Sequence, residues 1–286
     1  MTDYRSWLFV PADSPRKIEK GLSSEADCVI LDLEDSVATS EKGNARSLLS
    51  EFSSAIGDAA PAVFVRVNAL NDPNHSTDIE TALALPVDGI MLPKANSGAD
   101  VSALASSIEQ SQPTSPLSIA VIATETPGAL FNLGTYAGVS DRLTAITWGA
   151  EDLSAEVGAE RKRFETGEYT DLFRLARSLC LAGAAHANVQ ALDTVFTNIR
   201  DEESLKAECD AARQDGFTGK MAIHPAQVPI INAVFTPSGE AIDWANRVVN
   251  AFETHADTGV LSLDGTMIDR PHLKMAHSIL ARARQR

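Results

Sequence analysis

Eight short apolar or β-branched runs recur along this chain of 286 residues, and they alternate with segments of helical spacing. Short apolar runs bounded by turn residues predict buried strands, and strands that alternate with helices predict parallel βαβ units. Eight such units predict a closed (β/α)8 barrel, the TIM-barrel form of the α/β class. The predicted strands are Trp7–Val10, Cys28–Leu33, Val63–Val67, Gly89–Leu92, Leu117–Ala123, Leu143–Trp148, Ala191–Phe196 and Lys220–Ile223.

A doubly wound sheet is the alternative architecture for alternating strands and helices. The turn after its first strand would be a glycine-rich phosphate loop, but here that turn reads PADSPRK, and the chain contains neither GxGxxG nor GxxxxGK. We therefore favour the barrel. The helical segments between the strands are Pro15–Ser23, Glu41–Phe52, Ile79–Leu85, Val101–Gln110, Gly128–Tyr136, Tyr169–Ala187 and Glu202–Asp215.

The chain continues beyond the eighth strand, and we predict a barrel over residues 1–236 followed by a helical extension over residues 237–286. The extension could buttress the barrel, reach over its own mouth, or reach over the mouth of a neighbouring subunit. The segments beyond the eighth strand are a last barrel helix (Pro225–Phe235), a capped amphipathic helix (Ser238–His255), a glycine-rich loop or hairpin (Thr258–Arg270) and a final helix opened by Pro271.

The charge of the chain restricts its ligands. A net charge of −15 argues against a nucleic-acid partner, because phosphate contacts need a basic face. An anionic substrate would be repelled by the overall field, so its site must gather cations locally. The candidate cations are Arg5, Arg16, Lys17, Lys20, Arg66 and Lys94.

Cysteine usage and hydropathy indicate the compartment. The three cysteines, Cys28, Cys180 and Cys209, show no CxxC spacing and no even-numbered framework, which is typical of a reducing environment. The N-terminal apolar run is too short for a signal peptide or a membrane span, and no longer run follows. The sequence therefore predicts a cytoplasmic protein, or an organelle-matrix protein if a transit segment is removed, with no membrane partner.

Charged side chains gather where the predicted strands end, the place where α/β barrels carry their chemistry. Asp32, Glu34 and Asp35 follow the second strand, and Asp32 and Glu34 share a face by period-2 alternation. Such a ring of acids repels itself unless cations intervene. The other strand-end residues are Arg66 and Asn68, Lys94, Glu125, Glu151 and Asp152, and His224.

Carboxylates at neighbouring strand ends predict a site for a hard cation. A few carboxylate oxygens, with water in the remaining positions, suit Mg²⁺ or Mn²⁺ and leave places for substrate oxygens. His224 alone is not the histidine-rich set that zinc prefers. A buried Arg66 on an apolar strand indicates a substrate anion.

Structural alternatives stay open for several of these residues. Asp32, Glu34 and Asp35 could cap the next helix or pair with Lys42 and Arg46. Lys94 could form a Schiff base, or a salt bridge to the acidic ring, which we favour. His224 fits a structural role as well as a catalytic one.

The motifs taken together resemble the citrate lyase β-subunit-like (CitE-like) family of the HpcH/HpaI aldolase superfamily, and in particular its citramalyl-CoA and malyl-CoA lyases. They cover nearly the whole chain in the expected order. One departure is Thr124 and Pro127, where the family has an aliphatic residue and no proline. The matching stretches are LFVPADSPRKIEKG, DCVILDLEDSV, VFVRVNAL, GIMLPKAN, IATETPGAL, WGAEDLSAEVGA, GFTGKMAIHPAQV and DGTMIDRPHLKMA.

The resemblance implies roles for particular residues. Glu125 and Asp152 correspond to the ligands of a Mg²⁺ ion, with Mn²⁺ as an alternative, and Glu151 is then helix N-terminal or a supporting residue. Arg66 would contact the carboxylate or thioester end of the substrate, and Asp269 would complete the active site of an adjacent subunit. The remaining assignments are Glu34 and Asp35 beside the metal waters and neighbouring cations, and Arg16 and Lys17 near the phosphates of coenzyme A.

The resemblance also implies an assembly and an activity. We expect a homotrimer or a higher homo-oligomer that cleaves a citramalyl-CoA or malyl-CoA type thioester to acetyl-CoA and pyruvate or glyoxylate. Citramalyl-CoA is placed slightly ahead of malyl-CoA. The alternatives are a malyl-CoA thioesterase, a metal-dependent aldolase acting on free 2-keto acids without coenzyme A, a citrate lyase β-subunit, and a non-catalytic assembly subunit.

Overall fold

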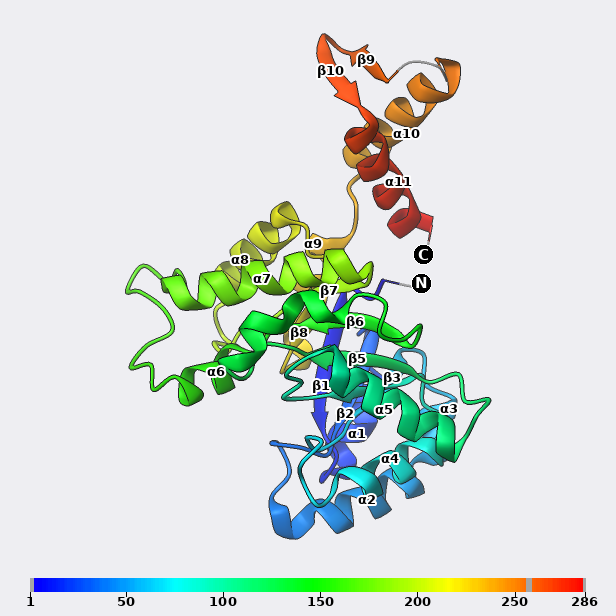
Figure 1. Ribbon diagram of the computed structural model, residues 1–286, viewed down its shortest axis with the longest axis vertical. Helices are drawn as coiled ribbons and strands as arrows, with labels where there is room; N and C mark the ends of the chain where they lie inside the picture. Colours follow the sequence, from blue (N-terminus) through cyan, green and yellow to red (C-terminus); the bar gives the residue numbers. More distant parts are fainter. Residues whose placement is uncertain (1–2, 256–258, 285–286) are drawn as a thin grey trace.

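The computed structural model describes residues 3–255 and 259–284. Eight parallel strands pair in sequence order and close on themselves through β8 and β1, which confirms the predicted (β/α)8 barrel (Figure 1). The strands are β1 (Ser6–Pro11), β2 (Cys28–Asp32), β3 (Ala62–Arg66), β4 (Gly89–Leu92), β5 (Ser118–Ile122), β6 (Leu143–Thr147), β7 (Gln190–Asp193) and β8 (Gly219–Ala222).

Helices connect the strands and cover the outside of the barrel. The α-helices of the barrel are α1 (Pro15–Leu22), α2 (Lys42–Glu51), α3 (Ser53–Gly57), α4 (His75–Leu83), α5 (Gly98–Ser111), α6 (Ala150–Glu156), α7 (Asp171–Ala187), α8 (Glu202–Asp215) and α9 (Val228–Phe235). The 3-10 segments are η1 (Thr39–Glu41), η2 (Gly128–Tyr136) and η3 (Pro225–Gln227).

The local structure differs from the sequence prediction at several places. The segment Gly128–Tyr136 is helical but of the 3-10 type, with glycines at both ends of GALFNLG weakening the α form. The short helices α3 and α6 were not among the helical segments predicted from spacing, because five or seven residues are too few to show a helical period. Helix α4 begins at His75 rather than at Ile79.

Two apolar layers hold the barrel together, one inside the ring of strands and one between strands and helices. Along β2, Cys28 and Ile30 belong to the inner layer while Val29 and Leu31 belong to the outer one. Because side chains alternate along a strand, Asp32 continues the inner face of β2, and Arg66 continues that of Phe64 on β3. The barrel interior therefore opens onto charged residues at the carboxyl ends of these strands.

The residues beyond α9 form a separate packed unit. Helix α10 (Gly239–Thr254), a hairpin of β9 (Val260–Leu263) and β10 (Thr266–Asp269), and helix α11 (Arg270–Arg284) share their own apolar cluster. Figure 1 shows this extension projecting from the end of the barrel where the chain begins, opposite the end toward which β1 points. The domain division at residue 236 stays a proposal.

A buried ionic cluster joins β7, β8 and α8. The ammonium of Lys220, fully buried, lies 2.7 Å from the carboxylate of Asp193 and 2.8 Å from that of Glu208. Burial alone would lower the pKa of Lys220, but the two acids raise it overall. Asp193 also accepts a hydrogen bond of 2.8 Å from the indole of Trp148, the residue that follows β6.

Lys220→Met is expected to lower the free energy of unfolding by about 3–5 kcal/mol, because it leaves Asp193 buried without its closest cation. Urea denaturation measures the change. The control is Lys206→Met, which removes a surface pair with Asp210 and should cost at most about 1 kcal/mol. Equal effects of the two substitutions would show that the buried cluster contributes no more than a surface pair.

No helix in the described part of the chain is both long and apolar enough to cross a bilayer.

Candidate active site

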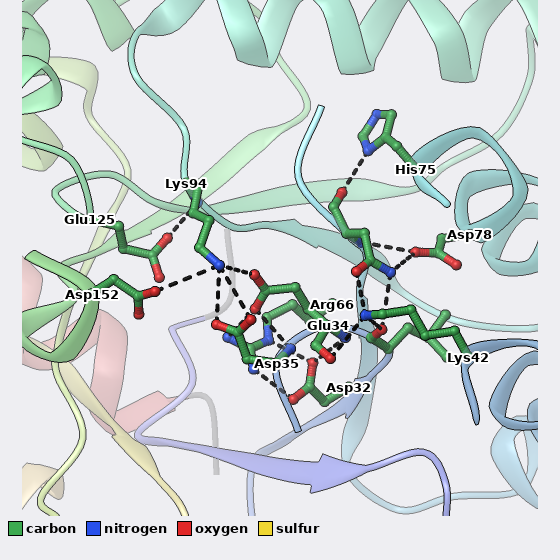
Figure 2. A network of polar contacts seen from close by, with 12 residues as sticks. Asp32, Glu34, Asp35, Lys42, Arg66, His75, Asp78, Lys94, Glu125 and Asp152 are labelled. Carbon is green, nitrogen blue, oxygen red and sulfur yellow. Dashed lines mark hydrogen bonds and ion pairs between the residues drawn. The ribbon is translucent and has the colours of Figure 1, made fainter. Parts of the chain in front are cut away.

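Glu125 and Asp152 lie side by side at the carboxyl end of the barrel (Figure 2). Glu125 follows β5, and Asp152 stands in the first turn of α6, which begins three residues after β6 ends. Because β5 and β6 are hydrogen-bonded neighbours, their ends bring the two carboxylates together. Glu125 is 2% exposed, whereas the side chain of Asp152 is 31% exposed, so the pair is open to solvent on one side only.

The backbone around Glu125 fixes its carboxylate. The backbone N–H of Lys94 donates to Glu125 Oε2, and Lys94 has a left-handed backbone with φ +53°. At Gly149 an added Cβ would stand 2.6 Å from Glu125 Cγ, so this position requires glycine. The hydroxyl of Thr124 accepts a 3.1 Å hydrogen bond from the N–H of Gly149, which ties the end of β5 to the end of β6. The residue that departs from the family pattern is thus a structural link beside the acid.

The electrostatics of the pair suit a divalent cation. Burial, and next the negative charge of Asp152, raise the pKa of Glu125 from 4.5 to about 8. A cation between the two carboxylates would offset both the burial of the Glu125 charge and its repulsion by Asp152. Carboxylate oxygens are also the ligands that Mg²⁺ prefers. Among the described residues no group of three or more acids, histidines or cysteines is arranged to hold a metal. The remaining positions would therefore belong to water and substrate.

Without divalent cations, Glu125→Gln is expected to stabilise the protein increasingly as the pH rises from about 4.5 to about 8. The folded-state pKa lies above the unfolded one, so the carboxylate progressively destabilises the native state across this window, and a neutral amide does not. At about 1.4 kcal/mol per pKa unit the difference reaches at most roughly 5 kcal/mol. Urea denaturation of both proteins in EDTA measures it, and a pH-independent difference would contradict the shift.

Arg66 lies at the mouth as predicted, where it pairs with acids. Its Nε and Nη2 bind the two oxygens of Asp32 at 2.7 and 2.6 Å, and its Nη1 is 3.0 Å from Glu34. Asp32 and Arg66 are register partners on β2 and β3, which explains the two-pronged contact. Burial alone would raise the pKa of Asp32, but Arg66 lowers it below its ordinary value. A contact of Arg66 with substrate stays a prediction.

Lys94 forms the salt bridge that we favoured over a Schiff base. Its ammonium lies 2.5 Å from Glu34, 3.1 Å from Asp35 and 3.6 Å from Asp152. Burial alone would lower the pKa of Lys94, but Glu34 and Asp35 raise it, so the amine is held in its charged form. Lys94 therefore connects the second-strand acids to the Glu125–Asp152 pair, as Figure 2 shows.

A buried network beneath Glu34 was not found from the sequence. The ammonium of Lys42 binds the carbonyl oxygens of Leu33 and Glu34 at 3.0 and 3.1 Å and Asn68 Oδ1 at 2.5 Å. Asn68 in turn donates to the buried carboxylate of Asp78 at 2.5 Å. The network holds the backbone on which Glu34 stands.

These contacts test the alternative that the second-strand acids pair with Lys42 and Arg46. Lys42 binds carbonyl oxygens rather than an acidic side chain, and Arg46 pairs with Asp78 at 2.8 Å. The pairing with Lys42 and Arg46 is therefore wrong. Asp32, Glu34 and Asp35 pair instead with Arg66 and Lys94.

The other strand-end residues take peripheral places. Glu151 pairs with Lys162, whereas Asp152 faces Lys94. The His224 ring accepts a 3.2 Å hydrogen bond from the N–H of Ala226 and caps η3, a contact of the kind that a structural histidine makes. Arg16 and Lys17 are exposed in the first turn of α1, which follows the carboxyl end of β1.

Asp269 lies far from this group within the chain. It is the last residue of β10, in the hairpin of the extension, whereas the acidic pair lies at the opposite end of the barrel (Figure 1). The structure thus brings Glu125, Asp152, Arg66, Glu34 and Asp35 to one place and leaves Asp269 apart.

A cavity of about 840 Å³ lies elsewhere in the described part of the chain. It is bounded by α7, α8 and the segment between α6 and α7, and neither acid of the pair lines it. Two of its arginines are already engaged, Arg163 with Glu208 at 2.6 Å and Arg177 with Asp215 at 2.5 Å. We place the active site at the acidic pair on chemical grounds.

A closed (β/α)8 barrel with paired acids at its carboxyl end defines the class as barrel enzymes with their site at the mouth. The chain belongs to the HpcH/HpaI aldolase/citrate lyase family, whose pattern matches residues 5–225. The resemblance read from the motifs is confirmed.

Relatives of this chain extend over almost its full length. A (3S)-malyl-CoA thioesterase of Cereibacter sphaeroides is 35% identical over 282 residues, covering 98% of this chain and 94% of its own. A citrate lyase subunit beta-like protein of Mycobacterium tuberculosis is 35% identical over 277 residues, covering 97% and 94%. The chain is therefore a CitE-like member of a lyase and thioesterase group.

A solved structure of protein CitE from Mycobacterium tuberculosis, in complex with magnesium, acetoacetate and coenzyme A, is similar in fold. Its TM-score is 0.78 at 34% identity, with 98% of this chain and 97% of that chain covered. A citrate lyase beta subunit from the same organism was solved with oxaloacetate and magnesium. Magnesium is thus present in structural neighbours of this protein.

Proposed function

We propose that this protein is a Mg²⁺-dependent 3-hydroxyacyl-CoA lyase. It would cleave a citramalyl-CoA or malyl-CoA type thioester reversibly to acetyl-CoA and pyruvate or glyoxylate. The observation that carries the proposal is the Glu125–Asp152 pair beside Arg66 and Lys94 at the barrel mouth. Relatives that bind magnesium, a small keto acid and coenzyme A support it.

Glu125 and Asp152 would hold the Mg²⁺, with Mn²⁺ as an alternative. When bound, the ion supplies Lewis acidity to the oxygens of a 2-hydroxy or 2-keto acid unit. Lys94 fixes one oxygen of Glu125 through its backbone N–H and balances Asp152 through its ammonium. The pair is thereby oriented before any ligand arrives.

Cations of the mouth would bind the anionic substrate. Arg66, fixed by Asp32 and Glu34, would stabilise the negative charge that develops on the thioester oxygen as the C–C bond breaks. Glu34 and Asp35 hold the neighbouring cation Lys94 in place. The exposed Arg16 and Lys17 would attract the phosphates of coenzyme A, offsetting the net charge of −15.

Asp269 would act on a site in a neighbouring subunit. The hairpin stands at the wrong end of its own barrel, and it exposes Val260 and Met267, each 57% accessible. An apolar surface around one carboxylate suits burial against a second copy of the chain, as in a homotrimer or higher homo-oligomer. In cleavage the 3-hydroxyl group of the substrate would lose its proton to water as the C–C bond breaks, and Asp269 would give a proton to the CH2 carbon of the resulting acetyl-CoA enolate. In condensation Asp269 would remove that proton from the methyl group of acetyl-CoA.

A malyl-CoA thioesterase is the second candidate function. The observation that favours it is the 35% identity with a protein of that name over 98% of the chain. The same residues could hydrolyse the thioester if a water molecule attacked its carbonyl carbon. The C–C bond would then stay intact.

Product analysis separates the two functions. Purified protein is incubated with Mg²⁺ and malyl-CoA or citramalyl-CoA, and the products are identified by chromatography and mass spectrometry. Acetyl-CoA with glyoxylate or pyruvate supports the lyase, whereas free coenzyme A with malate or citramalate supports the thioesterase. No turnover of either thioester would reject both.

A further inference from the structure

The hairpin that carries Asp269 is a rigid support. Its two-residue turn, Asp264–Gly265, has φ values of +54° and +77°, the left-handed conformation of a tight type I′ hairpin. Arg247 of α10 pairs with Asp264 and anchors the turn. Ile268, 2% exposed, packs into the core of the extension. Alternation along β10 then directs Asp269 to the outer face, where Val260 is its register partner.

One side chain contacts the carboxylate of Asp269 closely. His272, in the first turn of α11, places Nδ1 2.6 Å from Asp269 Oδ1 and 3.2 Å from the backbone nitrogen of Asp269. One ring nitrogen cannot donate to the oxygen and accept from the N–H at once. Two acceptors would repel at 2.6 Å, so the shorter contact requires a proton between Nδ1 and Oδ1. We assign that proton to Nδ1, which leaves Oδ2 outside this contact.

We propose that His272 is a positioning residue for Asp269, which holds Oδ1 so that Oδ2 faces the carbon with which a proton is exchanged. The proposal rests on the proposed function, in which Asp269 exchanges that proton. Both side chains are about one-third exposed, at 36% and 33%, on the face that carries Val260 and Met267. A carboxylate with a rotating side chain would spend much of its time misaligned, and misalignment of a reacting group by about 1 Å can cost on the order of 100-fold in rate.

A contact between His272 and Asp269 that only stabilises the start of α11 would have a different effect on kcat. Asp269 directly precedes α11, so the contact with His272 could serve only to begin that helix. In that case loss of His272 would lower the stability of the extension and leave kcat unchanged for the molecules that remain folded.

Three variants distinguish these readings. His272→Ala is expected to lower kcat on the order of 10- to 100-fold, with KM for the thioester and Mg²⁺ affinity changed by less than about twofold. His272→Asn places an amide N–H near the position of Nδ1 and should restore kcat to within a few-fold of the wild type. His277→Ala, an exposed histidine of the same helix, is the control and should behave as the wild type.

For each variant, thermal denaturation measures the stability, and the mass in solution shows whether the oligomer is kept. If His272→Ala does not fold, His272→Phe keeps a ring without the donor and makes the same comparison. A kcat for these variants equal to that of His277→Ala would overturn the proposal. So would an Asn variant as slow as the Ala variant.

A second readout does not need activity. With ¹⁵N-labelled histidine, the ring shifts of His272 should report a protonated Nδ1 that changes in Asp269→Asn, and an unprotonated Nδ1 would overturn the proposal. If the wild type turns over no thioester, the proposed function fails while the ring shifts still test the contact. If Asp269→Asn is inactive and His272→Ala is fully active, only the His272 inference fails.

Discussion

Glu125→Gln and Asp152→Asn are each expected to lower Mg²⁺-supported turnover by at least about 1,000-fold, equivalent to roughly 4 kcal/mol of transition-state stabilisation. The two carboxylates lie side by side at the mouth, and they are the groups that we propose to bind the metal. Each amide removes a negative charge without changing the shape of the side chain. Steady-state kinetics over a Mg²⁺ titration measures the loss, and calorimetry measures the accompanying loss of Mg²⁺ affinity.

The neighbouring acid provides a matched control. Glu151 precedes Asp152 in the same helical turn but pairs with Lys162. Glu151→Gln should therefore keep turnover to within about threefold, since a surface pair contributes at most about 1 kcal/mol. Equal losses for all three variants, or activity that EDTA does not affect, would reject the metal pair.

Asp269→Asn is expected to reduce turnover by about 100- to 10,000-fold, the usual contribution of a general acid–base group. Mg²⁺ affinity should be unchanged, because the proposed metal ligands are Glu125 and Asp152 and Asp269 is not one of them. Parallel kinetics and calorimetry test both parts. The control is Glu253→Gln, because Glu253 is an exposed acid on helix α10 of the same extension and lies outside the hairpin. Full activity of Asp269→Asn would show that the extension has a structural role only.

The barrel was predictable from the sequence because its signal repeats. Each strand is a short apolar run, each is followed by a helix, and eight repetitions leave few alternatives. The same pattern did not predict the bounds of the short helix α6 or the 3-10 form of η2. Seven residues are too few to show a period, and the choice between 3-10 and α turns depends on local packing.

The composition of the mouth was predictable, but its pairing was not. Parallel strands end at one edge, so Glu125, Asp152 and Arg66 had to lie near one another. Which acid takes which cation depends on register. Asp32 is the register partner of Arg66, and this cannot be read from either segment alone.

The residues that hold the backbone of Glu34 could not be identified from the sequence. Lys42, Asn68 and Asp78 come from α2, the segment after β3, and α4. A buried lysine bound to carbonyl oxygens resembles any surface lysine in sequence. The direction of the extension also depends on where α9 ends relative to the barrel axis, which local patterns do not specify.

Mixing two inactive variants tests most directly the claim that each active site combines the mouth of one chain with Asp269 of another. Asp152→Asn and Asp269→Asn are unfolded together, refolded as mixed oligomers, and assayed with the thioester and Mg²⁺. Random assembly should restore up to about a quarter of wild-type activity, since one site in four joins an intact mouth to an intact Asp269 of another chain. Mixed oligomers that form, as shown by two affinity tags, but regain no activity would contradict the account.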